Sequence, residues 1–274
     1  GLLPQNKAAF EKLIYKPYGL ILVVGHNGSG KTTTLHSAVS YINTPERKIW
    51  TAEDPVEITQ EGLRQVQVNP KIGLTFASAL RSFLRADPDV IMIGEMRDKE
   101  TAHIGVESSL TGHLVLSTLH TNSAPETVTR LLDMDLDPFN FADSLLCVLA
   151  QRLVKTLCPN CKQAYTPDAK ELEEMSLEFG PGWDVQAREF LRAKPTLYRK
   201  VGCGQCVCGY KGRVGVHELM INSSGIKDQI KRRKPTEEIR EQAVSEGMLT
   251  LKQDGMMKVL QGLTDMDQVR AASG

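Results

Sequence analysis

Short apolar runs alternate with longer stretches of mixed polarity through the first half of the chain. The apolar runs have the character of buried strands and fall at Leu20–Val24, Lys48–Ala52, Gln65–Val68, Val90–Ile93 and Leu114–Ser117. The mixed stretches predict helices at Lys31–Ile42, Thr75–Arg85, Lys99–Leu110, Pro125–Leu132 and Pro138–Ala150. This alternation predicts an α/β fold in which helices cover both faces of a mostly parallel sheet.

The character of the sequence changes at Cys158. Cysteine, glycine and proline punctuate the chain from there to about Gly212, interrupted by an acidic helical segment at Asp168–Glu178. Residues 223–274 then have a polar, helical composition with few aromatic side chains. We therefore expect an α/β core at 1–152, a cysteine-rich subdomain at 153–213 and a small helical subdomain at 214–274.

A glycine-rich stretch separates the first predicted strand from the first predicted helix. Residues 25–33 read GHNGSGKTT, which matches the phosphate-binding pattern G-x-x-x-x-G-K-[ST]. Glycines let backbone N–H groups turn toward a phosphate, and the helix N-terminus adds partial positive charge. The flanking strand and helix argue against a chance turn. The nucleotide-binding candidates are Gly25, Asn27, Gly28, Ser29, Gly30, Lys31 for the β- and γ-phosphates, Thr32 for Mg²⁺, and Thr33.

Carboxylates follow two predicted strands of the same sheet. Glu95 comes after the apolar run that ends at Ile93, where a carboxylate can face Mg²⁺ and the attacking water. Glu53, Asp54 and Glu57 follow another strand, and such a group could place a general base near the γ-phosphate. Surface acids are the alternative in both cases, since acidic turns are ordinary. The shared sheet favours the functional interpretation.

Histidines and arginines offer further candidates. His113 and His120 flank the strand at Leu114–Ser117, where each could sense the γ-phosphate or simply be a hydrogen-bonded histidine at a strand end. Arg81, Arg85 and Arg97 surround the strand that leads to Glu95, and arginines can stabilise the charge that develops in phosphoryl transfer. For any one arginine taken alone, an ordinary surface ion pair is the better interpretation.

Two C-x-x-C pairs predict a metal site. Cys158 with Cys161 and Cys203 with Cys206 provide four thiolates, the ligand set of a structural tetrahedral Zn²⁺. Their separation is long for a zinc ribbon, and the acidic insertion accounts for it. Cys208 could replace Cys206 as the fourth ligand, and unliganded or redox-active thiols are the remaining alternative. Cys147 lies in the helix predicted at Pro138–Ala150 and is expected to be a buried thiol.

Composition and charge narrow the possible functional classes of the protein. The 33 basic and 33 acidic residues give a net charge of +0, which argues against a general nucleic-acid binder. There is no apolar run long enough to cross a bilayer and no signal-peptide pattern, so a cytosolic protein is expected. The abrupt start at Gly1 is consistent with a fragment of a longer chain.

Taken together, these motifs resemble the secretion ATPases that power type II secretion and type IV pilus assembly. The resemblance covers nearly the whole chain: the glycine loop, an acidic box at 53–57, a second nucleotide motif at 87–98 and a histidine box at 111–122. The stretches Gln151–Val154 and Gly209–Leu219 beside the cysteine pairs also match. Retraction ATPases of this superfamily lack the cysteine pairs, so the resemblance is to the assembly and secretion branch.

The resemblance implies a RecA-like P-loop NTPase core and a homo-hexameric motor that uses ATP, Mg²⁺ and a zinc-binding subdomain. It implies a location on the cytoplasmic face of the inner membrane, beside a membrane platform protein, with N-terminal domains of its own and without nucleic acid. The implied roles are a general base for Glu57, a Mg²⁺ and water carboxylate for Glu95, and phosphate sensors for His113 and His120. Arg81, Arg85 and Arg97 would stabilise charge, and Arg213 would contact nucleotide.

Two departures from the family pattern are visible. His26 and Asn27 stand where the family commonly has Pro-Thr, and the spacing after Cys206 is shorter than usual. Two other functions stay open on the sequence: a DNA-uptake or other P-loop motor, and a nucleotide-binding scaffold without hydrolysis. The sequence does not distinguish pilus assembly from type II secretion.

Overall fold

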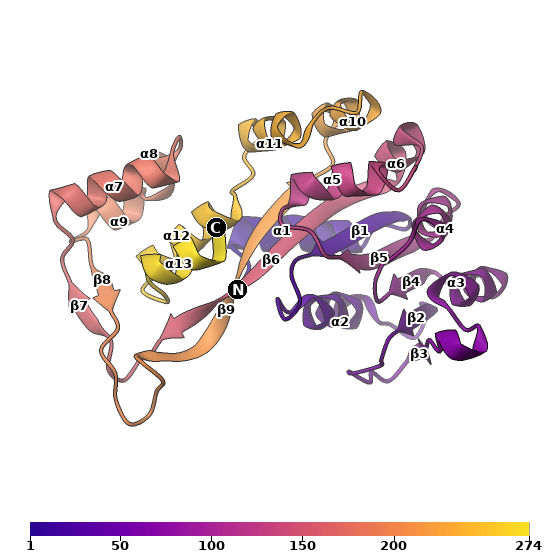
Figure 1. Ribbon diagram of the computed structural model, residues 1–274, viewed down its shortest axis with the longest axis horizontal. Helices are drawn as coiled ribbons and strands as arrows, with labels where there is room; N and C mark the ends of the chain where they lie inside the picture. Colours follow the sequence, from indigo (N-terminus) through magenta and orange to yellow (C-terminus); the bar gives the residue numbers. More distant parts are fainter. Residues whose placement is uncertain (274) are drawn as a thin grey trace. The chain divides into compact units, whose positions relative to one another are not determined.

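The computed structural model describes residues 1–273, which form two compact units (Figure 1). The first unit comprises residues 3–151 and 218–248. The second comprises residues 1–2 and 152–217 and continues from 249 to the last described residue. Both units are therefore discontinuous along the chain. The division into three continuous regions stays a prediction from the sequence.

A seven-stranded sheet has the order β3-β2-β4-β5-β1-β6-β9. The strands are β1 (Gly19–Val24), β2 (Ile49–Glu53), β3 (Leu63–Gln67), β4 (Val90–Ile93), β5 (Leu114–Leu119), β6 (Leu145–Leu157) and β9 (Tyr210–Ile221). Every pairing from β3 across to β6 is parallel. All residues of β1, β4 and β5 are buried, as their mainly apolar sequences predict for strands covered on both faces.

The helices of the first unit lie mostly between its strands in the sequence. They are α1 (Pro4–Ile14), α2 (Lys31–Ile42), the 3₁₀ turn η1 (Pro70–Ile72), α3 (Phe76–Arg85), α4 (Lys99–Leu110), α5 (Ala124–Leu132), α6 (Pro138–Ser144), α10 (Ser224–Lys231) and α11 (Thr236–Ser245). Side chains cap several N-termini, as Asp98 does for α4 and Ser123 for α5. The α/β class and the mostly parallel sheet are confirmed.

The helix predicted at Pro138–Ala150 is wrong in its second half. Helix α6 ends at Ser144, and the next residue begins β6, which pairs in parallel with β1. Periodicity cannot separate a buried helix from a buried strand within a short apolar run. Cys147 is buried as expected, but in a strand, and burial raises the pKa of its thiol to about 12.

The second unit contains one end of β6 and of β9, a small further sheet and several helices. Strands β7 (Gln163–Tyr165) and β8 (Leu197–Arg199) pair antiparallel. The helices are α7 (Ala169–Phe179), α8 (Trp183–Gln186), α9 (Arg188–Arg192), α12 (Leu251–Leu260) and α13 (Met266–Ser273). Phe179 and Trp183 pack with ring centroids 5.6 Å apart. Among residues 1–273, no helix has both the length and the hydrophobicity that a bilayer crossing requires.

Candidate nucleotide and metal sites

The glycine loop connects β1 to α2 at the carboxyl edge of the parallel sheet. Gly28 and Gly30 have φ of 76° and 87°, the left-handed region that favours glycine. Among the described residues no side chain caps α2, so its first N–H groups are available to a phosphate. Ser29 Oγ is buried and has no hydrogen-bond partner within residues 1–273. The loop therefore fits the phosphates of a nucleotide.

Lys31 is buried within this loop. Its ammonium donates to the carbonyls of Gly25 at 2.8 Å and His26 at 3.0 Å, and to Nδ1 of His120 at 3.2 Å. Because an ammonium can only donate, Nδ1 of His120 accepts. The proton of the neutral imidazole is then on Nε2, which lies 3.0 Å from Oε1 of Glu95.

Glu95 extends the same network to a further strand end. Its Oε2 accepts from Nε of Arg97 at 2.7 Å, and Nη1 of Arg97 donates to Asp54 at 3.1 Å. The hydrogen bond from Arg97 to Glu95 raises the pKa of the guanidinium, although burial opposes this. Lys31, His120, Glu95, Arg97 and Asp54 thus form one chain of contacts.

These five side chains come from the carboxyl ends of four neighbouring strands. The glycine loop follows β1, His120 follows β5, Glu95 follows β4 after one glycine, and Asp54 follows β2. Parallel strands place such residues at one edge of a sheet, where α/β proteins bind ligands. The structure brings together the predicted Lys31, Glu95, Arg97 and His120.

The acidic box divides into three different environments. The carboxylate of Glu53 is buried and is hydrogen-bonded to His36 Nε2 at 2.6 Å, Thr51 Oγ1 at 2.8 Å and Gln65 Nε2 at 3.0 Å. Asp54 pairs with Arg97. Glu57 is exposed, and within residues 1–273 the structure shows no partner for its carboxylate. Glu53 is therefore a structural acid, while Glu57 remains a candidate base.

Other predicted residues lie away from the glycine loop. His113 precedes β5, where its Nδ1 donates to the carbonyl of Pro88 at 2.7 Å, and its own carbonyl accepts from Gly19 at the start of β1. It is therefore at the opposite end of the strands from Lys31, so the structure does not bring it to the loop.

The structure also leaves three predicted arginines outside the contacts of the glycine loop. Arg81 pairs with Glu100, and Arg85 is exposed at the end of α3. Arg213 is exposed on β9 in the second unit.

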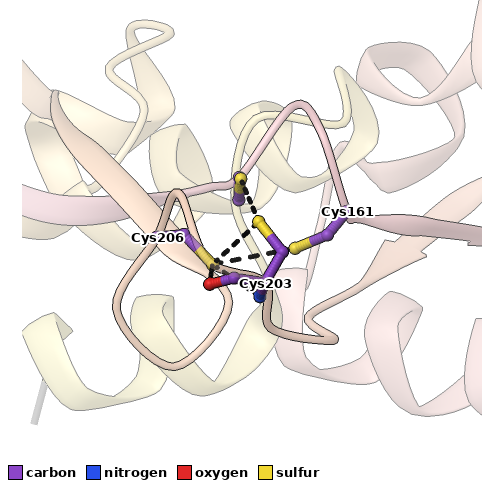
Figure 2. Close-up of side chains that lie close together, drawn as sticks. Cys161, Cys203 and Cys206 are labelled. Carbon is purple, nitrogen blue, oxygen red and sulfur yellow. Dashed lines mark hydrogen bonds between the residues drawn. The ribbon is translucent and has the colours of Figure 1, made fainter.

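The four cysteines of the two C-x-x-C pairs converge in the second unit. Figure 2 shows Cys161, Cys203 and Cys206 close together. All four Sγ atoms lie within 4.8 Å of one another. The Cys158–Cys203, Cys161–Cys206 and Cys203–Cys206 sulfur pairs are 4.0, 3.8 and 3.7 Å apart. A tetrahedron with Zn–S bonds of about 2.3 Å has edges of about 3.8 Å. The cluster therefore fits a tetrahedral ion, with Cys206 rather than the exposed Cys208 as its fourth member.

Backbone N–H groups point at these sulfur atoms. Cys203 N–H donates to Cys206 Sγ at 3.2 Å, and Gly202 N–H donates to Cys161 Sγ at 3.3 Å. Burial raises the pKa of Cys206, but N–H groups of Cys203 and Gly209 outweigh it and lower the pKa to about 7. For Cys161 the Gly202 N–H acts in the same direction, yet burial and the neighbouring thiols raise the pKa to about 11. A cation would allow all four thiols to ionise together.

The fold and the glycine loop together define an α/β protein with a phosphate-binding loop. The type II/IV secretion system protein family matches residues 1–271, and the chain belongs to this family.

Curated relatives agree with this assignment. The type II secretion system ATPase E of Vibrio cholerae is 46% identical over 270 residues, 98% of this chain and 51% of that protein. The type IV pilus assembly ATPase PilB of Myxococcus xanthus is 47% identical over 270 residues, 98% of this chain and 46% of that protein. The chain thus spans about half the length of these relatives.

Solved structures share the fold. The crystal structure of the pilus retraction motor PilT with bound ADP has a TM-score of 0.72 and 28% identity, covering 100% of this chain and 65% of that one. The ATPase DotB of Legionella pneumophila has a TM-score of 0.66 and 24% identity, covering 98% of this chain and 63% of that one. At that identity the second likeness concerns the fold alone.

Proposed function

We propose that this chain is the catalytic part of a motor that hydrolyses ATP to drive type II secretion or type IV pilus assembly. The observation that carries the proposal is the continuous network from Lys31 through His120, Glu95 and Arg97 to Asp54. It places a cation, a neutral imidazole and a carboxylate side by side at the mouth of a phosphate loop. Such positioning and charge are what phosphoryl transfer needs from a protein.

Each residue has a defined part in this proposal. The loop N–H groups and Lys31 bind the β- and γ-phosphates, so Lys31 exchanges loop carbonyls for phosphate oxygens. Thr32 and Glu95 would hold Mg²⁺, which when bound would supply positive charge to neutralise the phosphates. His120 keeps its proton on Nε2 and links the lysine to Glu95. Glu57, exposed beside this edge, is the proposed base, and Arg81, Arg85 and Arg213 are candidates for completing the site in an assembly.

The proposal includes the setting in which the motor works. The names of the relatives support a role in secretion or pilus assembly. By resemblance we propose a homo-hexamer on the cytoplasmic face of the inner membrane, acting on a membrane platform protein and without nucleic acid. The relatives' greater length supports further domains in the whole protein. The cysteine cluster would hold a structural Zn²⁺, because four thiolates leave no open position for catalysis.

Steady-state hydrolysis of MgATP by the wild type and the variants Lys31→Ala and Glu95→Gln tests this function. We expect turnover to fall at least about 100-fold in both, with nucleotide binding retained in Glu95→Gln. Lys170→Ala and Glu174→Gln, on an exposed face of α7, are the matched controls. Light scattering on the same samples relates turnover to the hexamer.

Three outcomes would contradict the proposal. Turnover that survives Lys31→Ala removes the assigned site. A clean hexamer that binds ATP without hydrolysing it, even as the full-length protein, indicates a scaffold. Hydrolysis stimulated by DNA indicates a DNA motor instead.

A further inference from the structure

The side chain of Gln151 holds the phosphate loop by two short hydrogen bonds. Its Nε2 donates to the carbonyl of Ser29, and its Oε1 accepts from Thr34 Oγ1, both at 2.6 Å. Ser29 is in the middle of the loop, and Thr34 is in the first turn of α2. Because the carbonyl of Ser29 can only accept, the amide NH₂ of Gln151 must face it, and the amide oxygen is then left to accept from the Thr34 hydroxyl. Gln151 is buried, with 5% of its surface exposed.

The glycines of the loop show how closely Gln151 packs against it. A Cβ atom added to Gly30 would lie 2.7 Å from Gln151 Nε2, and one added to Gly25 would lie 2.5 Å from the Gln151 carbonyl oxygen. A Cβ at Gly28 would meet nothing within 4 Å. Two loop glycines therefore make room for Gln151, whereas Gly28 faces open space.

The position of Gln151 follows from strand register. Ala150 on β6 pairs with Val24, the last residue of β1, so the next residue of β6 lies beside the start of the loop. A buried neutral amide is well suited to this place, because it satisfies a loop carbonyl and a helix hydroxyl without adding charge beside the phosphates.

We propose that Gln151 is a positioning residue of the nucleotide site. It fixes the Ser29 peptide and the first turn of α2, so that the loop N–H groups are already oriented when phosphates arrive. This inference rests on the proposed function, since it assigns a role within the same site. Preorganisation of this kind strengthens binding of substrate and transition state alike.

The test measures KM and kcat for MgATP, and Kd for a fluorescent ATP analogue, in Gln151→Ala, Gln151→Glu, Thr34→Val and Thr34→Ser. We expect KM and Kd to rise about tenfold in both Gln151 variants and about threefold in Thr34→Val. We expect kcat to stay within about twofold of the wild type, because uniform binding is what is lost. Thr34→Ser keeps the hydroxyl and should have the KM and Kd of the wild type. Gln261→Glu is the matched control, because Gln261 is exposed at the end of α12.

A purely structural role gives a different result. Gln151 variants with a lowered melting temperature and reduced kcat at unchanged KM and Kd would overturn the proposal, as would Thr34→Val with wild-type Kd. If Gln151→Ala does not fold, the comparison of Kd between Thr34→Val and Thr34→Ser tests the proposal instead. If the wild type proves not to hydrolyse ATP, the proposed function fails, yet the ratio of Kd values between Gln151→Glu and Gln261→Glu still tests the inference.

Discussion

The phosphate-loop edge and the cysteine cluster are assembled by different physical means. At the edge, side chains follow four neighbouring strands, and the residues of β1, β4 and β5 are all buried. In the cluster, the ligands come from loops, and Cys203 is exposed. The edge is held by a large apolar core, whereas in the cluster backbone N–H groups of Gly202 and Cys203 donate to sulfur atoms.

This difference indicates where each site obtains its geometry. Burial of the strands fixes the edge before any ligand arrives, which is the preorganisation that catalysis requires. A segment with little core of its own obtains most of its order from a metal, because metal-binding free energy is then folding free energy. We therefore expect the two sites to respond differently to substitution and to chelation.

Removal of one cysteine ligand is the most severe way to test this contrast. We expect Cys206→Ser to lose the proposed zinc and to reduce amide protection in residues 158–213 at least about 100-fold, because metal binding and local folding are linked. Protection of β1 and β5 should be little changed. Zinc content and hydrogen exchange measure both effects.

Cys208→Ser is the matched control, since this exposed cysteine lies outside the cluster. It should keep its zinc and its protection pattern. Loss of zinc in Cys208→Ser but not in Cys206→Ser would reverse the ligand assignment. Full protection of 158–213 in the metal-free protein would show that this segment folds through its own packing.

Glu53→Gln tests the claim that the edge depends on buried packing. The amide would present a donor where Glu53 now accepts from His36, Thr51 and Gln65, and we expect a loss of about 3 kcal/mol. Urea unfolding followed at Trp50 on β2 measures it, in a Trp183→Phe background that removes the signal of the second unit. The exposed Glu57→Gln should cost less than about 0.5 kcal/mol. Equal stability of the two variants would contradict the structural role of Glu53.

Much of the first unit could be predicted from the sequence. The expected strands and helices up to Leu132 match the structure within a few residues, because strand runs and helix stretches differ in length and are separated by turn residues. The second half of the predicted helix at Pro138–Ala150 was wrong because the choice between helix and strand depends on the neighbouring strand β1, which the local sequence pattern does not contain.

The candidate site was predicted only in part, for a similar reason. The glycine loop and the cysteine pairs have local spacings that encode their chemistry. By contrast, Gln151 is more than a hundred residues from Ser29 in the sequence, and its bond to the loop arises from register between β6 and β1. The sequence signal for Gln151 was its place in the matched stretch Gln151–Val154, which assigned it no role. His113 and His120 lie at opposite ends of β5, and only the fold shows which of them meets the glycine loop.

Glu178 on α7 tests how much of the second unit is held by side-chain contacts, and its expected effect is the smallest. Arg270 donates to its carboxylate at 3.0 and 3.2 Å, and Lys252 lies 3.4 Å away. Burial acts to raise the pKa of Glu178, but these cations lower it below its ordinary 4.5. Since both cations are partly exposed, we expect Glu178→Gln to cost only about 0.5 kcal/mol at pH 7, measured at Trp183 in a Trp50→Phe background.

The pH dependence identifies the source of this stability. A carboxylate whose folded-state pKa is depressed stabilises the fold above its unfolded-state pKa, and that contribution is lost as pH falls through the folded-state value. The difference between wild type and Glu178→Gln should therefore be constant above about pH 5, decline as the pH falls below 4.5, and vanish once the pH is below the folded-state pKa. A stability difference that persists in acid would mean that the substitution disturbs packing. Glu174→Gln on the same helix is the control, because its ion pair with Lys170 is more exposed. If the Glu178 effect is unchanged after zinc is removed, the contacts of α7 with α12 and α13 fold without the metal, and the dependence on zinc is confined to the cysteine loops.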